Sequence, residues 1–186
     1  MENKSKGIGE RMIEAARWTI QRFANDEDAK NNLEYSKEEC QKLFGKDEQI
    51  SVINQEFLPG MGNALVNAGI NQLTTLLAGG GGVNFGAGAY LGVGTSTAAE
   101  NASYTDLQAA SDKLRVAMNG AYPTYGTSQK ITWQSDFTSA QANFSWQEFA
   151  VFSGASGGTM LNRKISDQGT KTSGQTWRLT LEITFS

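Results

Sequence analysis

The sequence contains no histidine and a single cysteine, Cys40, among its 186 residues. Without histidine the chain cannot form a Ser-His-Asp or Cys-His catalytic arrangement, nor a histidine-ligated zinc or haem site. One cysteine allows neither an internal disulfide nor a metal site of four cysteines. These absences exclude several common hydrolytic and metal-based chemistries from this chain.

Long apolar runs are missing as well. No stretch of 18 apolar residues occurs, so we expect no transmembrane helix and no membrane partner. The first residues lead into no continuous apolar stretch, so a secretory signal is not expected. We therefore expect a protein that is made in a reducing cytosol and that carries no cofactor.

Charge is distributed unevenly along the chain. Residues 1–60 carry nine basic and twelve acidic residues, whereas residues 61–186 carry seven of each. This shift predicts two regions, a charged N-terminal arm over 1–60 and a neutral body over 61–186. Neither region is basic enough for nucleic acid to be the principal ligand.

The N-terminal arm is predicted to be helical. Apolar residues recur at spacings of three or four over residues 8–24, which places them on one helix face. A second, short helix is expected from Ser36, which forms a capping box with Glu39, and Gly45 ends it. The first helix supplies the candidates for docking on a neighbouring protein, and the alternative is that the same residues pack on the chain's own body: Ile8, Met12, Ala16, Trp18, Ile20 and Phe23.

The body is predicted to consist of one helix, over residues 61–78, followed by strands. Apolar and polar residues alternate strictly over 177–185 and again over 131–137, which is typical of half-buried strands. Five or six strands separated by turns predict an α+β, mainly β fold, in which the helical arm precedes an antiparallel β-sandwich or barrel-like domain. Further strand candidates lie at 89–94, 114–118, 149–152 and 160–165.

Three patterns raise the question of chemistry. Residues 91–95, Leu-Gly-Val-Gly-Thr, suggest a phosphate-binding loop but lack the Lys-Ser/Thr ending and a third glycine, which favours turns or close packing instead. Cys40 lies among charged residues, where a reactive thiol and an ordinary buried cysteine are the alternatives. The acidic residues of the body do not cluster, so we predict no enzyme, unless a cleft joins Asp136 or Glu148 to another carboxylate.

The aromatic residues are the remaining candidates for binding. Trp133, Trp146 and Trp177 lie in alternating segments, which predicts that they belong to the core. Tyr122 and Tyr125 flank a proline turn and are predicted to be surface residues that contact a protein partner or a glycan.

Several segments after residue 60 follow one another in a distinctive order. A helical stretch containing Asn67-Ala68-Gly69-Ile70-Asn71-Gln72-Leu73 leads into residues 90–99, and the turn Thr105-Asp106-Leu107 follows. Later come residues 147–152, residues 158–164 and a final alternating strand. In this order the region 61–186 resembles the small β-domain found in virion proteins of tailed bacteriophages.

The resemblance implies a function in assembly. A protein of this kind is expected in the virion, made in the cytoplasm of a bacterial host, where it associates with itself and with other virion proteins. Head decoration or cement, and a tail, collar or fibre component, are equally compatible with it. The alternative function is a carbohydrate-binding module at a host-facing phage tip. The signature contains no catalytic residue, in keeping with a non-enzymatic structural role.

Overall fold

Antiparallel strands form most of the chain in the computed structural model, which describes residues 15–56 and 63–185. The first sheet has the order β2-β1-β10-β7-β6, and every neighbouring pair in it is antiparallel. Its strands are β2 (Ile50–Glu56), β1 (Ala15–Phe23), β10 (Thr176–Thr184), β7 (Lys130–Phe137) and β6 (Thr124–Thr127).

The second sheet has the order β3-β9-β8-β4-β5 and is also antiparallel throughout. The mainly β character predicted from the alternating patterns is therefore confirmed. Its strands are β3 (Asn63–Leu65), β9 (Met160–Ile165), β8 (Glu148–Phe152), β4 (Tyr90–Gly94) and β5 (Lys113–Ala117).

The two sheets enclose one apolar core. Trp146 occupies its centre, with ring centroids 4.8 Å from Phe137 and 4.9 Å from Trp177, both edge to face. Trp133 and Trp177 are likewise buried, at 2% and 3% exposure, so the predicted core position of these three tryptophans is confirmed. A smaller cluster lies on the outer face of the second sheet, where Phe152 packs with Leu107 and other apolar residues.

The helix predicted over residues 8–24 is wrong for the part that the structure describes. Ala15–Phe23 is strand β1, which pairs with β10 on one side and β2 on the other. Its inward side chains are Ala16, Trp18 and Ile20, which alternate with Arg17 and Thr19. Alternation buries a full row of a sheet, whereas a helix here would leave β10 without a partner on that edge.

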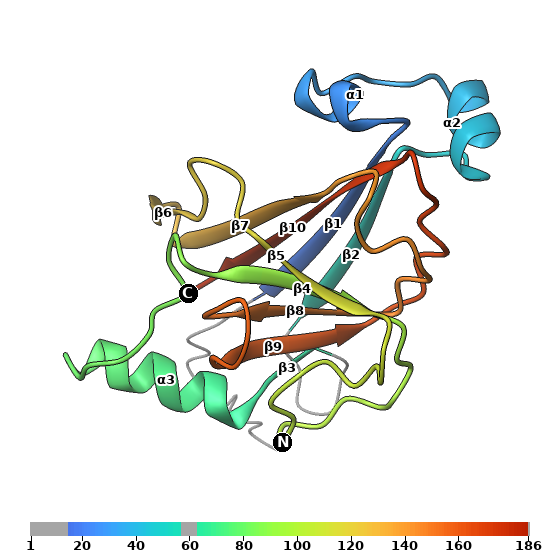
Figure 1. Ribbon diagram of the computed structural model, residues 1–186. Helices are drawn as coiled ribbons and strands as arrows, with labels where there is room; N and C mark the ends of the chain where they lie inside the picture. Colours follow the sequence, from blue (N-terminus) through green and yellow to red (C-terminus); the bar gives the residue numbers. More distant parts are fainter. Residues whose placement is uncertain (1–14, 57–62, 186) are drawn as a thin grey trace, which may run out of the picture.

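The predicted division near residue 60 does not separate an arm from a body. Strands β1 and β2 belong to the same sheet as β10 and β7, so residues from both sides of the division share one core. Between β1 and β2 the chain forms α1 (Asp26–Lys30) and α2 (Lys37–Phe44), which lie together at one end of the molecule (Figure 1).

The helices of the structure agree in part with the helix signals of the sequence. The capping box from Ser36 to Glu39 and the left-handed Gly45 after α2 are present as predicted. Asn25 begins α1, because its side chain accepts hydrogen bonds from the amides of Glu27 and Asp28. Helix α3 (Asn67–Leu77) confirms the later part of the helix predicted over 61–78, but the prediction is wrong for Asn63–Leu65, which is strand β3.

Candidate functional site

An apolar groove of about 410 Å³ lies between α3 and the two sheets, and strands of both sheets line it. Leu73 and Leu76 of α3 form one wall, and Ile131 and Trp133 of β7 form the opposite wall. The size falls within the range of protein binding sites. Residues that complete the lining include Leu65, Phe85, Leu161, Ile183 and Phe185.

A close backbone contact positions α3 over this groove. The helix approaches β9 so closely that a Cβ atom at Gly69 would lie 2.4 Å from the carbonyl oxygen of Leu161. The amide of Val66, just before the helix, donates to the same carbonyl oxygen at 3.1 Å. On the other side, Trp133 Nε1 donates to the Phe85 carbonyl oxygen at 2.7 Å and fixes the loop after α3. The groove is thus built by backbone contacts and apolar walls.

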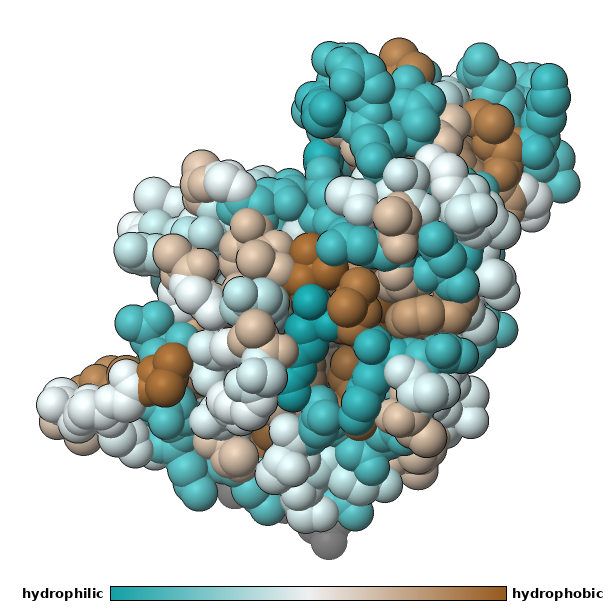
Figure 2. Space-filling view, viewed as in Figure 1, coloured by the Kyte–Doolittle hydropathy of each residue, from teal (hydrophilic) through white to brown (hydrophobic). Residues whose placement is uncertain are grey.

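No charged residue occurs between Glu56 and Glu100, the part of the sequence that supplies α3 and the loop after it. Apolar side chains nevertheless reach solvent there, because Leu77 is 79% exposed and Val83 is 58% exposed. Figure 2 shows hydrophobic surface at the left, where α3 ends in Figure 1. Depletion of charge together with exposed apolar side chains is characteristic of the cores of protein interfaces.

The two predicted surface tyrosines lie at different depths near the groove. Tyr125, on β6, is 71% exposed and contributes to the groove lining, whereas Tyr122 is half-buried. Asn119, a polar neighbour of the turn, is bonded inside the protein, since its amide nitrogen donates to Gln134 and Asp136. Tyr125 is therefore the better placed of the two for contact with a partner.

Four of the six predicted docking residues in the arm belong to the chain's own core. Ala16, Trp18, Ile20 and Phe23 are at most 1% exposed, so their side chains are not presented to a neighbouring protein. Their packing in β1 agrees with the alternative interpretation, in which these residues pack on their own domain. Ile8 and Met12 lie outside the described residues.

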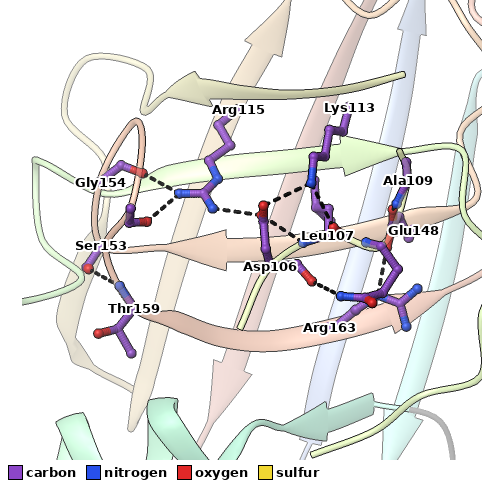
Figure 3. A network of polar contacts seen from close by, with 12 residues as sticks. Asp106, Leu107, Ala109, Lys113, Arg115, Glu148, Ser153, Gly154, Thr159 and Arg163 are labelled. Carbon is purple, nitrogen blue, oxygen red and sulfur yellow. Dashed lines mark hydrogen bonds and ion pairs between the residues drawn. The ribbon is translucent and has the colours of Figure 1, made fainter. Parts of the chain in front are cut away.

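A buried ion pair holds the loop between β4 and β5, residues 95–112, on the outer face of the second sheet (Figure 3). Arg163 Nε donates to Glu148 Oε2 at 2.7 Å, and both side chains are at most 1% exposed. The same carboxylate accepts hydrogen bonds from the amides of Gln108 at 2.9 Å and Ala109 at 2.8 Å. One carboxylate therefore binds a cation from a strand and two amides from the loop.

Asp106 extends this network toward β5. It accepts hydrogen bonds from Lys113 Nζ at 2.9 Å and Arg115 Nη2 at 2.8 Å. Burial opposes ionisation of Asp106, but the hydrogen bonds from Arg115 and Lys113 outweigh it, so the pKa of this carboxyl lies below its usual value. Arg115 also donates to the carbonyl oxygens of Gly154 and Gly157, and its guanidinium stacks 3.5 Å from the centre of the Phe152 ring.

The glycines of residues 91–95 are explained by this packing. A Cβ atom at Gly94 would lie 2.5 Å from Glu148 Oε1, and one at Gly92 would lie 2.8 Å from the Phe152 ring. The structure thus supports the interpretation as close packing, because the loop and the buried pair fill the space that side chains would need. The sequence signal for the network was the Thr105-Asp106-Leu107 turn together with these glycines, but nothing in it identified Arg163 as the partner of Glu148.

Three further groups that the sequence or their environment singles out are buried or paired, namely Cys40, Lys171 and Asp136. Cys40 is 1% exposed, and burial raises the pKa of its thiol, as expected of an ordinary buried cysteine. Burial lowers the pKa of Lys171 to about 8, yet its ammonium is bonded to the Thr138 carbonyl oxygen and the Asn143 amide oxygen. Asp136 pairs with Arg178 at 2.7 Å.

Within the described residues there is no group of three or more acidic or cysteine side chains that could hold a metal ion. Over the same residues, none of the helices has both the length and the apolar character that crossing a bilayer requires. Comparisons with models of protein families, with curated proteins and with solved structures found no significant match.

Proposed function

We propose that this chain is a non-enzymatic structural component of a tailed-phage virion, which works by associating with copies of itself and with neighbouring virion proteins. The observation that carries the proposal is the uncharged apolar groove beneath α3, with Leu77, Val83 and Tyr125 exposed around it. A surface of this kind is stabilised when another protein covers it.

The arrangement of the phage-like segments adds support. The turn at Asp106, the segment that begins with Glu148 and the segment that contains Arg163 meet in one network on the second sheet (Figure 3). Each of these residues is engaged in holding a loop to a sheet, as expected of a structural signature. Two positions in the virion are compatible with this role: head decoration or cement, and a tail, collar or fibre component. The copy number in the particle distinguishes them.

The test is to measure the copy number of the chain in purified particles by quantitative mass spectrometry. Symmetric assembly predicts on the order of hundreds of copies for a head or tail-tube lattice and roughly six to eighteen for a tail or neck component. Particles that contain no copies of the chain, although it is expressed during their production, would overturn the proposal.

Carbohydrate binding is the second candidate, and one observation favours it. Tyr125 is 71% exposed, and an exposed aromatic face can stack on a sugar ring. The apolar walls of the groove offer few hydrogen-bond partners to a sugar, which places this function second. A glycan array compares the wild type with Tyr125→Ala and with Thr127→Ala, an exposed residue of the same strand. Binding that only Tyr125→Ala abolishes is expected, and silence of the wild type excludes the function.

A further inference from the structure

Helix α3 is a poorly buried element with an apolar surface. Gly69 is its one buried residue, while Ile70 is 41% and Leu77 is 79% exposed. The helix has 11 residues, no side-chain hydrogen bond at its N-cap and no charge in its first or last turn. A helix of this length is marginal in water on its own, so packing must stabilise it. A surface helix normally turns charged or polar residues outward, which α3 does only with amides and hydroxyls.

The groove and the exposed side chains lie next to each other on the same part of the surface. Leu76 lines the groove, whereas its neighbour Leu77 projects into solvent, and the exposed Val83 follows in the loop between α3 and β4. The molecule therefore offers a cavity and a projection side by side. A two-fold interface requires such a patch, because each copy must supply both complementary parts.

The absence of charged residues between Glu56 and Glu100 also restricts which kind of protein can bind to this patch. An acidic or basic partner would find no complementary group on α3 or on the loop after it. Two copies can bring these surfaces together without placing like charges opposite each other. A second copy of this chain brings an equally uncharged surface, together with a projecting Leu77 of its own.

We propose that two copies of this chain associate about a two-fold axis near the C-terminal end of α3, so that Leu77 and Val83 of each copy enter the groove of the other. This inference rests on the proposed function, for which it supplies the surface of self-association. Each copy would cover the exposed side of α3 in its partner. The contact would fill both grooves with aliphatic side chains.

Analytical ultracentrifugation of the full chain over a range of concentrations tests the proposal. The wild type is expected to dimerise, and Leu77→Glu is expected to raise the dissociation constant about 100-fold, because it places a carboxylate in an apolar groove. Leu33→Glu is the matched control, since Leu33 is 46% exposed in the segment between α1 and α2, and these two helices lie at the opposite end of the molecule from α3 (Figure 1). It should leave the dissociation constant unchanged. Circular dichroism and thermal unfolding of both variants verify that the monomer is folded.

A crosslinking experiment tests the geometry directly. Leu77→Cys is mixed with Tyr125→Cys under mild oxidation, and a disulfide-linked heterodimer is expected because Tyr125 lines the groove that Leu77 enters. Leu33→Cys mixed with Tyr125→Cys should give no such species. The native Cys40 is 1% exposed and does not compete.

Several outcomes would overturn the inference. These are a wild type that stays monomeric at every concentration, a dimer that Leu77→Glu leaves intact, and a monomer that binds lipid vesicles in flotation instead of dimerising. The proposed function fails separately. A chain that dimerises as described but is absent from particles refutes the virion role alone, whereas a Leu77→Glu variant that still dimerises yet enters particles refutes the inference alone.

Discussion

The loop of residues 95–112 and helix α3 both lie against the second sheet, but they are attached to it in opposite ways. The loop has no helix or strand, yet Glu148, Arg163 and Arg115 bind its backbone and its Asp106 with charge-assisted hydrogen bonds. Helix α3 is regular, yet it is held only by the close approach at Gly69, by two backbone hydrogen bonds at its start and by two half-buried leucines, with no charged group among these contacts.

The comparison shows that regular secondary structure and firm attachment to the sheet are separate properties. The loop is held by hydrogen bonds from buried and half-buried charged groups, whereas α3 leaves Leu77 and Ile70 in water. Elements that are held weakly and expose apolar groups are the ones that gain most from an additional contact. We therefore expect substitutions in the loop network to act on folding and substitutions on the outer side of α3 to act on association.

The largest effect is expected from Glu148→Ala. This change leaves the buried Arg163 guanidinium without its carboxylate and two loop amides without their acceptor, and it should lower the free energy of unfolding by about 4 kcal/mol. Urea denaturation measures the loss. Glu182→Ala is the control, because Glu182 forms its ion pairs at a partly exposed position, and its cost should be below about 1 kcal/mol. Equal losses in the two variants would contradict the special role of the buried pair.

The next effect is expected from Gly69→Ala. Alanine improves helix propensity, but its methyl group would meet the Leu161 backbone at 2.4 Å, and backbone cannot move aside as a side chain can. Overpacking of this kind should cost about 2 kcal/mol net and should loosen α3, which thermal unfolding and limited proteolysis will measure. Gly81→Ala is the control, since nothing lies within 4 Å of its Cβ position. A variant as stable as the wild type would show that α3 is attached in another way.

Parts of this architecture were accessible from the sequence because one periodicity dominated them. In β10 the residues Trp177, Leu179, Leu181 and Ile183 alternate without interruption, and the structure places all four in the core. In β1 two periods compete. Ala16 and Ile20 fit a helix face as well as a strand face, and the buried Arg22 interrupts the apolar row where a strand would have continued it.

The candidate groove could not be read from periodicity. Its walls come from Leu73, Trp133 and Ile183, which are far apart in the chain and meet only because the fold brings α3 close to β7 and β10. The available signal was the long uncharged segment around Gly69, a compositional feature that does not indicate which surface it forms. The partner of Glu148 was hidden for a similar reason, since the pairing of β8 with β9 brings Arg163 to it.

Acid should release the loop before it affects α3, which carries no titratable group. The pKa of Asp106 is lowered in the folded state, so this group contributes stability above the ordinary value of 3.8 and loses it as the pH falls through the lower folded value. We expect the amide of Leu107, which donates to Asp106 Oδ1 at 2.8 Å, to exchange faster with solvent below that pH in hydrogen-exchange measurements. Asp106→Asn should remove this dependence while the amides of α3 behave identically in both proteins. A loop whose exchange ignores acid in the wild type would contradict this account.

The smallest effect on stability is expected in α2. This helix can be compared with α3, because each of the two buries a single residue, Cys40 in α2 and Gly69 in α3. The Ser36 hydroxyl accepts a hydrogen bond from the amide of Glu39, and the Glu39 carboxylate accepts one from the amide of Ser36. These two hydrogen bonds cap the first turn of the helix. Ser36→Ala should cost about 1 kcal/mol in local stability, which faster exchange of the Glu39 amide will report.

The control for α2 is Glu39→Gln, because glutamine can complete the same capping box and should change exchange only slightly. Helix α3 has no capping box, because its N-cap residue is Val66, which makes no side-chain hydrogen bond. If Ser36→Ala leaves α2 as protected as before, capping does not distinguish the helices, and the exposed leucine of α3 alone must account for its dependence on a partner. If the amides of α2 in Ser36→Ala exchange as fast as those of α3, the capping box is what keeps this short, solvent-exposed helix folded without a partner.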